Sequence, residues 1–446
     1  MDEYGRAPAD RARGSQDAIL HAQRVGQPAT LVNAAPGAGK THLTVRVALD
    51  AVTRGDRVVV AAATNAQAAD LARRLAHDAP RETIVLLLGR AVAPPNNLRP
   101  LVAAGTLRIA CTTAALPDAP PILIGTAARL SYLDPERYGA ELLLVDECYQ
   151  LTDVAFGMIV ALGQRVCLIG DAGQIPPVVT IDIADWHGDD PGPHVACPLA
   201  LAFRHPWIRC LGLPVTRRLL ADTVRVIAPI FYSGMQMEAL HDERHRRLTL
   251  TRRGGSALDR PLDLLESGCG MTLATLPARE TGEVDRELAA TLVGLAVRSL
   301  ERGLAVHEGG RDTVIAPRDI GIVCTHVSQV VAVRQGLPRA LREILVETAE
   351  RWQGLERALM LVHHPLSGRA SDSSAHLLSA ARMCVMTTRH RVGCIIVARG
   401  GMADDLEQAP PSGAHMFGGG PDPTLAGWHA HRCLLAALAP STTVVA

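Results

Sequence analysis

The sequence predicts an α/β protein built on parallel sheets. Residues 57–63 (RVVVAAA) and 141–145 (ELLLV) are continuous apolar runs rather than alternating ones. Such runs are typical of strands that are buried on both faces of a parallel sheet. Segments of helical character separate them, which is the alternation expected of an α/β fold. At 446 residues the chain has room for two or more domains with large cores.

Composition excludes several classes of protein. No apolar stretch reaches the ~20 residues that a membrane-spanning helix needs, and the polar N-terminus does not resemble a signal peptide. The ten cysteines are scattered without a Cys-x-x-Cys pair, which favours reduced thiols over zinc ribbons or a disulfide scaffold. The net charge is zero, so any nucleic acid must bind in a local groove. We therefore expect a cytoplasmic protein with no membrane partner.

The most specific local motif is a phosphate-binding loop. Of the 45 Lys and Arg residues only Lys40 is a lysine, and it lies in residues 34–41 (AAPGAGKT), a loop of the Walker A type. A short apolar run precedes the loop and a helix-like run follows it, as the motif requires. The compact charge of a lysine fits inside a ring of backbone N–H groups, whereas the planar fork of an arginine does not. The residues expected to bind the nucleotide here are Gly37, Gly39, Lys40, Thr41 and His42.

Two carboxylates end the apolar run at 142–145. We expect Asp146 to hold Mg²⁺ through water together with Thr41, and Glu147 to orient or deprotonate an attacking water. The alternative is a solvated Asp-Glu pair at a strand end. The strand context and the phosphate loop upstream favour a nucleotide hydrolase with ATP and Mg²⁺ as its cofactors.

A third run, 166–177 (VCLIGDAGQIPP), again places a polar turn after an apolar strand. Gln174 in this turn is placed to sense a γ-phosphate, and two prolines stiffen the loop that follows.

Eight segments, in order along the chain, together resemble the motifs of superfamily 1 helicases. The resemblance is to the 5′→3′ branch that contains the nonsense-decay and Dna2-like enzymes. The segments are 14–16 (GSQ), 63–66 (ATNA), 124–127 (IGTA), 146–150 (DECYQ), 170–177 (GDAGQIPP), 213–219 (LPVTRRL, followed by FYSG at 231–234), 346–356 (VETAERWQGLE) and 385–391 (VMTTRHR).

The resemblance implies two tandem RecA-like lobes with ATP in the cleft between them. It implies that Gln16 reads adenine, that Gly354 and Glu356 lie at the nucleotide with Glu356 on the ribose, and that Arg218 and Arg389 act as arginine fingers on the γ-phosphate. Together with Lys40, Glu147 and Gln174, these arginines form the catalytic set. The residues implied to contact nucleic acid are Thr64, Asn65, Thr126, Pro177 and Thr348.

Several departures from the family pattern leave alternatives open. Arg217 stands where the family often has tyrosine, so either Arg217 or Arg218 can be the finger. Residues 363–365 (HHP) replace the family's strand-binding serine, which weakens the expected grip on nucleic acid. Trp352 can stack on a base or pack inside the protein. Cys148 replaces a small alanine.

The chain is expected to have a flexible tail (1–13), a first lobe (14–210) and a second lobe (211–446), with no accessory barrel ahead of the motor. Three segments have the composition of loops or insertions: 180–198, 236–273 and 404–423. A final helix is expected at 425–438.

The second of these insertions carries six basic residues whose role is left open. Arg244, His245, Arg246, Arg247, Arg252 and Arg253 can contact phosphates or form a solvated surface. His241 and His245 have the i,i+4 spacing of a helical metal pair, although a surface pair is favoured because no third ligand is evident.

These features favour an ATP-dependent helicase or translocase that moves 5′→3′ on single-stranded nucleic acid, with DNA preferred and RNA left open. The direction rests on the QIPP form of residues 174–177. The alternative is an ATP-driven switch that sets the shape of a complex with a nuclease or scaffold protein, in defence or a mobile element, with little unwinding. The zero net charge and residues 363–365 favour this alternative.

Overall fold

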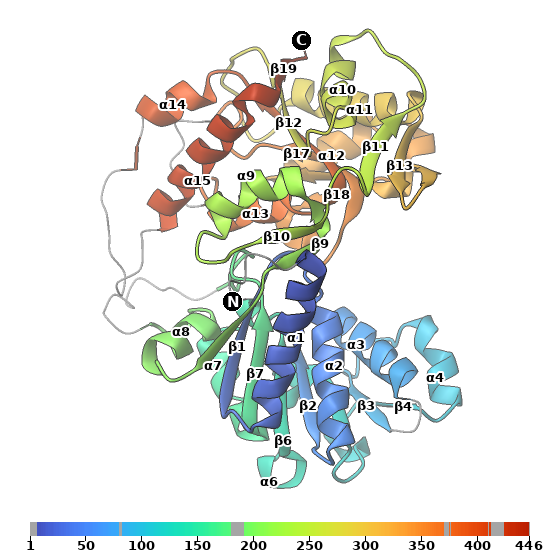
Figure 1. Ribbon diagram of the computed structural model, residues 1–446, viewed down its shortest axis with the longest axis vertical. Helices are drawn as coiled ribbons and strands as arrows, with labels where there is room; N and C mark the ends of the chain where they lie inside the picture. The colour runs from blue at the N-terminus through green and yellow to red at the C-terminus, as the bar shows by residue number, and fades with distance from the viewer. Residues whose placement is uncertain are drawn as a thin grey trace. The chain divides into compact units, whose positions relative to one another are not determined.

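The chain folds as two compact units, each around its own parallel β-sheet (Figure 1). The computed structural model describes residues 7–79, 83–179, 191–369, 374, 376–408, 410–411 and 423–445. Unit 1 comprises Met1–Ala172 and Pro176–Pro214, and unit 2 comprises Gly173–Ile175 and Val215–Ala446. The predicted α/β class with two parallel-sheet lobes is confirmed. The main division after Pro214 lies close to the expected boundary at residue 210.

The sheet of unit 1 has eight strands in the order β4-β3-β5-β2-β6-β7-β1-β8, and all its pairings are parallel. Its strands are β1 (Ala29–Ala34), β2 (Val58–Ala62), β3 (Ile84–Leu87), β4 (Leu107–Ala110), β5 (Ile122–Thr126), β6 (Ala140–Asp146), β7 (Gly163–Gly170) and β8 (Arg209–Leu213). The apolar runs at 57–63 and 141–145 form the neighbouring central strands β2 and β6. Because β6, β7 and β1 are adjacent and parallel, the residues that follow them gather at one edge of the sheet.

Helices cover both faces of this sheet. They are α1 (Pro8–Arg24), α2 (Lys40–Thr53), α3 (Asn65–Asp78), α4 (Arg99–Ala103), α5 (Ala127–Leu130), α6 (Pro135–Tyr138), α7 (Asp153–Gly157) and α8 (Cys197–Arg204). In Figure 1, α1 and α2 lie over one face, next to β1, β7 and β2. Leu130, Phe156 and Cys197, from α5, α7 and α8, pack on the other face with Val59 and Leu143.

Two expectations about loops in unit 1 are corrected by the helix boundaries. Residues 8–13 were expected in a flexible tail, but they form the first turns of α1, which begins with Pro8 as helices often do. Residues 1–6 lie outside the described part. Of the loop expected at 180–198, residues 180–190 are not described, and Cys197 already begins α8.

Unit 2 contains a six-stranded parallel sheet and two smaller sheets. The large sheet has the order β16-β15-β17-β18-β12-β19, a short parallel pair joins β9 to β10, and an antiparallel sheet has the order β11-β13-β14. The strands are β9 (Val215–Leu220), β10 (Glu238–His241), β11 (Arg246–Leu250), β12 (Met271–Leu276), β13 (Leu304–Glu308), β14 (Arg311–Val314), β15 (Ile320–Cys324), β16 (Leu345–Thr348), β17 (Arg357–His363), β18 (His390–Arg399) and β19 (Thr442–Val444). Residues 236–273, expected as a loop or insertion, therefore contain regular structure.

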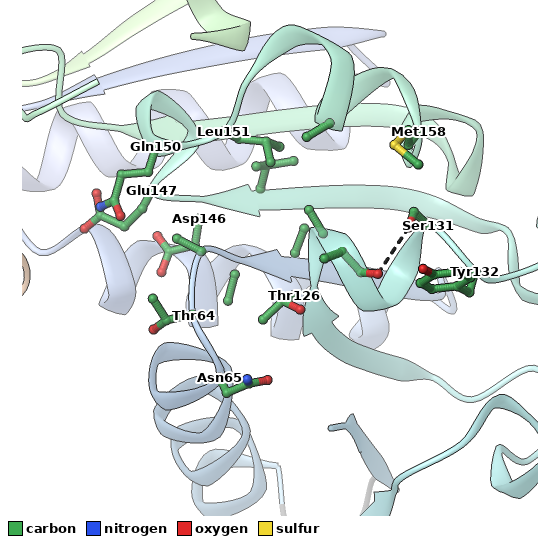
Figure 2. A pocket seen from close by; sticks show the side chains of 17 residues that line it. Thr64, Asn65, Thr126, Ser131, Tyr132, Asp146, Glu147, Gln150, Leu151 and Met158 are labelled. Atoms are coloured by element: carbon green, nitrogen blue, oxygen red, sulfur yellow. Dashed lines mark hydrogen bonds between the residues drawn. The ribbon is translucent and has the colours of Figure 1, made fainter. Parts of the chain in front are cut away.

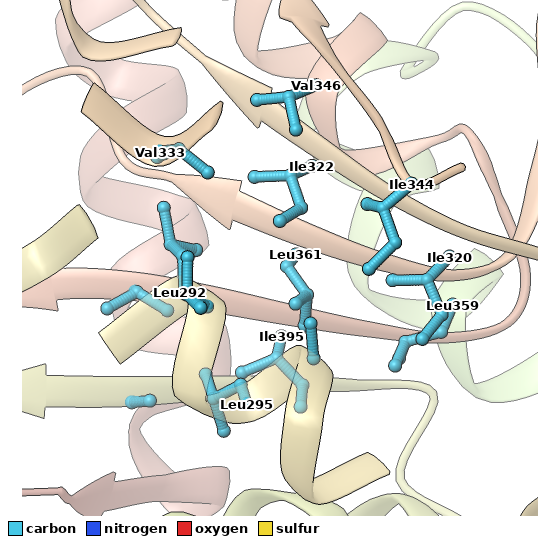
Figure 3. Close-up of a cluster of buried hydrophobic side chains, with 14 of the residues drawn as sticks. Leu292, Leu295, Ile320, Ile322, Val333, Ile344, Val346, Leu359, Leu361 and Ile395 are labelled. Atoms are coloured by element: carbon cyan, nitrogen blue, oxygen red, sulfur yellow. The ribbon is translucent and has the colours of Figure 1, made fainter. Parts of the chain in front are cut away.

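Most helices of unit 2 pack against its large sheet. The helices of this unit are α9 (Ala221–Phe231), α10 (Arg260–Glu266), α11 (Arg286–Glu301), α12 (Val327–Gly336), α13 (Ala380–Thr387), α14 (Met402–Gln408) and α15 (Pro423–Leu438). Figure 3 shows Leu292 and Leu295 of α11 against Ile322, Leu361 and Ile395 of three neighbouring strands. This continuous apolar core explains why these strands read as unbroken apolar runs.

The C-terminal helix α15 confirms the helix expected at 425–438. Of the flexible excursion expected at 404–423, residues 404–408 belong to α14, and most of the remainder lies outside the described residues. Among the described helices, none combines the length and apolar character that crossing a membrane requires.

Candidate nucleotide-binding site

The phosphate loop connects β1 to α2 in a conformation that depends on glycine. Gly37 and Gly39 have φ angles of 73° and 92°, which a residue with a Cβ rarely adopts. Gly39 is the N-cap of α2 and provides no side-chain acceptor for the first-turn amides. The positive end of a 14-residue helix therefore begins directly after this loop, an arrangement that suits an anion.

Lys40 is the first residue of α2, and its ammonium lies between two carboxylates. Its Nζ is 3.6 Å from Asp171 Oδ2 and 3.8 Å from Glu147 Oε1. The Asp171 side chain is fully buried and that of Lys40 is only 10% exposed. The ends of β1, β6 and β7 thus supply one cation and two anions to the same place. Asp171 received no role in the sequence analysis, although its position directly after a predicted strand was a signal that could have assigned one.

Asp146 ends β6 and is almost completely buried. Burial, followed by the charge of Glu147, raises the pKa of Asp146 to about 7, while Lys40 and Thr44 oppose the shift. Thr44 donates its hydroxyl to Asp146 Oδ1 at 3.3 Å. The structure thus joins Asp146 directly to Thr44 of α2. Thr41, which was expected to share Mg²⁺ with Asp146, is half-buried at the start of the same helix. The helical spacing of Thr44 from the phosphate loop could have indicated this contact.

Glu147 has an unusual backbone conformation, with φ 55° and ψ 44°. Among the described residues, only Ala119 shares a positive φ without being glycine. Such strain persists where the surroundings fix the chain, and it often marks a functional site. The next residues are held firmly, because Tyr149 donates a hydrogen bond to Asn33 Oδ1 at 2.7 Å and Cys148 is completely buried.

Cys148 also explains a glycine on the neighbouring strand. A Cβ added at Gly170 would lie 2.6 Å from Cys148 Sγ, so the sulfur occupies the space that a side chain there would need. The departure from the family's alanine at 148 is thus accommodated by the glycine at 170.

Gln16 lies on α1 and is 5% exposed. Its side-chain oxygen accepts a hydrogen bond from Arg46 of α2, while His42 is exposed one residue after Thr41. The structure places Gln16 against the helix that follows the phosphate loop, with its amide oxygen engaged by an arginine that the sequence analysis did not single out.

Three of the residues predicted to contact nucleic acid line one pocket of unit 1. Thr64 and Asn65 at the start of α3 and Thr126 at the end of β5 face a cavity of about 670 Å³ (Figure 2). Asp146 and Glu147 line the same cavity. Thr64 is fixed there by a reciprocal capping box with Gln67. Of the other two predicted contacts, Pro177 is half-buried in unit 1 outside this lining, and Thr348 ends β16 in unit 2.

The segments of unit 2 that carry Arg218 and Arg389 lie close together near Glu356. Arg218 Nε lies 2.6 Å from Glu356 Oε2, and Arg218 Nη1 donates to the carbonyl oxygen of Thr388 at 3.3 Å. Arg389 follows Thr388, is 2% exposed and donates from Nε to Val385. Arg217, the alternative finger, is exposed.

The remaining predicted nucleotide contacts in unit 2 are Gly354 and Gln174. Gly354 is exposed with a φ of 78°, and Gln174 is buried beside Ile175, whose carbonyl accepts from Gln353 at 3.4 Å.

Two of the open alternatives in unit 2 concern buried side chains. Trp352 is fully buried and donates to the carbonyl of Ile322 at 3.2 Å, so it packs inside unit 2 and does not stack on a base. His363 and His364 are buried too, which removes both from the surface.

Two further alternatives concern the segment at 236–273. His241 belongs to β10 and His245 to the following turn, so the helical metal pair is wrong, and the described residues contain no group of three metal-ligating side chains. Arg246 is 2% exposed, so it neither contacts phosphates nor belongs to a solvated surface, and both expectations for this arginine are wrong. Arg244, Arg247, Arg252 and Arg253 are exposed, so phosphate contact and a solvated surface stay open for them.

Comparison with known proteins identifies the family of the chain. Two family models, each described as an AAA domain, match residues 16–180 and 283–400. This pair of domains is typical of superfamily 1 helicases, and the two matches contain seven of the eight predicted motifs in whole or in part. The chain belongs to the superfamily 1 helicase ATPases. No curated protein matches it.

The solved structures that match this chain are distant from it in sequence. The arterivirus nonstructural protein 10 (helicase) in complex with DNA has a TM-score of 0.45 and 14% identity, covering 89% of this chain and 65% of its own. The PRRSV helicase has a TM-score of 0.41 and 14% identity, covering 90% of this chain and 58% of its own. The E. coli DExH-box NTPase HrpB has a TM-score of 0.40 and 11% identity, covering 92% of this chain and 43% of its own. This chain therefore spans less than two thirds of the length of each.

Proposed function

We propose that this protein hydrolyses ATP and couples hydrolysis to movement along single-stranded nucleic acid. The observation that carries the proposal is the position of the only lysine. Lys40 lies directly after a glycine-dependent loop, at the positive end of α2, with its ammonium between Glu147 and Asp171. A bound phosphate would take the place of these carboxylates as the partner of the ammonium.

The residues present fit a nucleotide with its Mg²⁺. The left-handed Gly37 and Gly39 and the N-terminus of α2 form an anion cradle, and the buried Asp146 carboxylate stands beside it. Asp146 and the hydroxyl of Thr41 would hold Mg²⁺ through water, with Thr44 orienting Asp146. The metal, when bound, neutralises phosphate charge. Gln16, His42, Gly354 and Glu356 are the proposed contacts of the nucleoside end.

Glu147 is the proposed base for the attacking water. Its strained backbone fixes the carboxylate beside Asp146 and Lys40, and the water would attack the γ-phosphorus to give ADP and phosphate. Gln174 is the proposed sensor of the γ-phosphate. Arg218 and Arg389 are proposed to stabilise the charge that develops on the transferring group. Arg218 Nε lies 2.6 Å from Glu356 Oε2, so this carboxylate holds the guanidinium in place beside the proposed nucleotide contacts.

The proposed nucleic-acid site includes the pocket of Figure 2. Thr64, Asn65 and Thr126 offer short polar side chains suited to a sugar–phosphate backbone, and Pro177 and Thr348 are further proposed contacts. The proposed substrate is single-stranded nucleic acid, with DNA preferred. The proposed direction of movement along it is 5′→3′, on the strength of residues 174–177. Unwinding of matched duplexes with a 5′ or a 3′ single-stranded tail tests the direction. Preference for the 3′ tail would overturn the direction and leave the ATPase intact.

A second candidate function is an ATP-driven switch that acts with a nuclease or scaffold protein. The burial of His363 and His364 favours it, because the segment where the family carries a strand-binding serine is not at the surface. Both candidates require ATP hydrolysis, but only the motor uses single-stranded nucleic acid as its track. The ATPase rate with and without single-stranded DNA or RNA therefore distinguishes them. Stimulation supports the motor, and indifference supports the switch.

A further inference from the structure

One arginine of the basic segment at 244–253 lies inside unit 2 rather than on its surface. Arg246 begins β11 and is 2% exposed, although Arg244 and Arg247 beside it are exposed. Burial lowers the pKa of Arg246, with the charge of Glu308 opposing the shift. A buried guanidinium is costly unless its N–H groups find acceptors, so its partners indicate why it is retained.

The acceptors of Arg246 are the backbone of two other arginines. Its Nη2 donates to the carbonyl oxygen of Arg218 at 2.7 Å and to that of Arg217 at 3.1 Å. Charge-assisted hydrogen bonds of this kind are stronger than bonds between neutral groups. The peptide groups on either side of Arg218 are both held, because the Arg218 N–H donates to Thr216 Oγ1 at 3.2 Å.

The β-ladder explains why these carbonyls need a side-chain partner. Thr216 pairs with Ala239 and Leu220 pairs with His241, with a register shift between the two pairs. Three residues of β9, at 217–219, therefore stand opposite the single residue Leu240. Such a bulge interrupts the ladder and re-aims the side chains in it. Arg246 supplies hydrogen bonds at the place where the ladder is interrupted.

Arg246 is itself anchored to residues 385–391, the segment that carries Arg389. Its cross-strand partner is Glu308, whose carboxylate lies 3.6 Å from Arg246 Nη1 and 2.9 Å from Arg391 Nη2. Arg391 comes two residues after Arg389. The β11-β13-β14 sheet thus contacts both segments that carry the proposed fingers.

We propose that Arg246 is a positioning residue for ATP hydrolysis, which fixes the bulge of β9 so that the Arg218 side chain is preorganised. This inference rests on the proposed role of Arg218. Preorganised charge accelerates a reaction because no rearrangement is needed at the transition state. Loss of Arg246 should therefore lower kcat with little change in KM for ATP.

The test compares Arg246→Gln with Arg247→Gln, an exposed neighbour on the same strand, using the full chain and steady-state ATP hydrolysis. We expect Arg246→Gln to lower kcat at least ~10-fold, with KM within about 3-fold of wild type, since misplacement by about 1 Å can cost ~10²-fold. Arg246→Lys should recover part of the rate, because one ammonium keeps the charge but not the fork. Arg247→Gln should match wild type, since the assay contains no nucleic acid for this exposed arginine to contact.

A double variant separates positioning from a merely structural role. In an Arg218→Ala background, Arg246→Gln should reduce kcat by less than about 2-fold further, because its effect operates through Arg218. The proposal is overturned if the double variant lowers kcat by the product of the two separate effects. The proposal is also overturned if Arg246→Gln keeps the wild-type kcat while Arg218→Ala lowers it. Wild-type kcat in Arg218→Ala would instead refute the finger assignment, and the positioning role with it. If Arg246→Gln does not fold, Glu308→Gln removes the half-exposed anchor, and an unchanged kcat there would contradict the proposal.

Discussion

The ammonium of Lys40 lies 3.6 Å from the carboxylate of Asp171, which is fully buried. A buried carboxylate needs a nearby positive charge, and the protein places its single lysine there, at the mouth of the phosphate loop. The same ammonium is the proposed partner of the β- and γ-phosphates. Nucleotide binding and the stability of this part of unit 1 therefore depend on one side chain.

Replacing Lys40 should abolish ATP turnover. Lys40→Ala removes the charge, and Lys40→Arg replaces it with a planar fork that does not fit the loop between Gly37 and Gly39. We expect both variants to hydrolyse ATP at least ~10²-fold more slowly than wild type in a steady-state phosphate-release assay. Arg99→Ala, an exposed arginine of unit 1, is the control. Hydrolysis by Lys40→Arg near the wild-type rate would contradict the role of the compact charge.

Replacing a finger arginine should slow hydrolysis without preventing ATP binding. We expect Arg389→Ala and Arg218→Ala each to lower kcat by ~10³-fold or more while a fluorescent ATP analogue still binds. Arg217→Ala is the matched control, because Arg217 is exposed and adjacent. A slow Arg217 variant beside a normal Arg218 variant would reverse the assignment. Equal loss of binding and turnover in Arg389→Ala would make that buried residue structural.

The stability of the protein should fall as the pH is lowered below the usual pKa of histidine. Burial lowers the pKa of His363 and His431 to about 4 and that of His390 to about 3, against a usual value of 6.5. Below that value the unfolded chain binds protons that the folded protein does not. The stabilisation is therefore complete above the unfolded pKa and is lost as the pH falls toward the folded values, by ~1.4 kcal/mol per pH unit for each histidine.

Urea unfolding at about pH 7 and at about pH 5 measures this loss. Between these two pH values the variant His363→Gln should lose less unfolding free energy than wild type. The difference should be the contribution of roughly one histidine. An unfolding free energy that is constant over this pH range would contradict the prediction.

The sequence predicted those parts of the site in which chemistry and local structure coincide. The phosphate loop carries its glycines, lysine and helix in one contiguous segment, and Asp146 and Glu147 end a short apolar run that favours a buried strand. The contacts that the sequence did not predict join distant segments. Thr44 reaches Asp146, and Arg246 reaches the backbone of Arg217 and Arg218, through register and packing that no local pattern encodes.

Arg246 is the clearest example of this limit. Its neighbours in the sequence are charged and exposed, so the composition of 244–253 indicates a solvated or phosphate-binding surface. Alternation along β11 turns this one guanidinium inward, toward a bulge in β9 whose existence depends on the pairing with β10. Residues 236–273 were expected to be a loop for the same reason, because their polar composition hid short strands.

The most direct test of the central claim is the ATPase rate of the wild-type protein with and without single-stranded DNA or RNA, from about 50 mM to about 200 mM salt. A motor should be stimulated at low salt, and the stimulation should weaken as salt rises, with a slope set by the number of phosphates that the protein contacts. We expect weak binding at physiological salt, because a protein of zero net charge contacts few phosphates. Lys40→Ala should show no hydrolysis under any of these conditions. An active ATPase that is indifferent to both nucleic acids at low salt would contradict the motor and favour the switch.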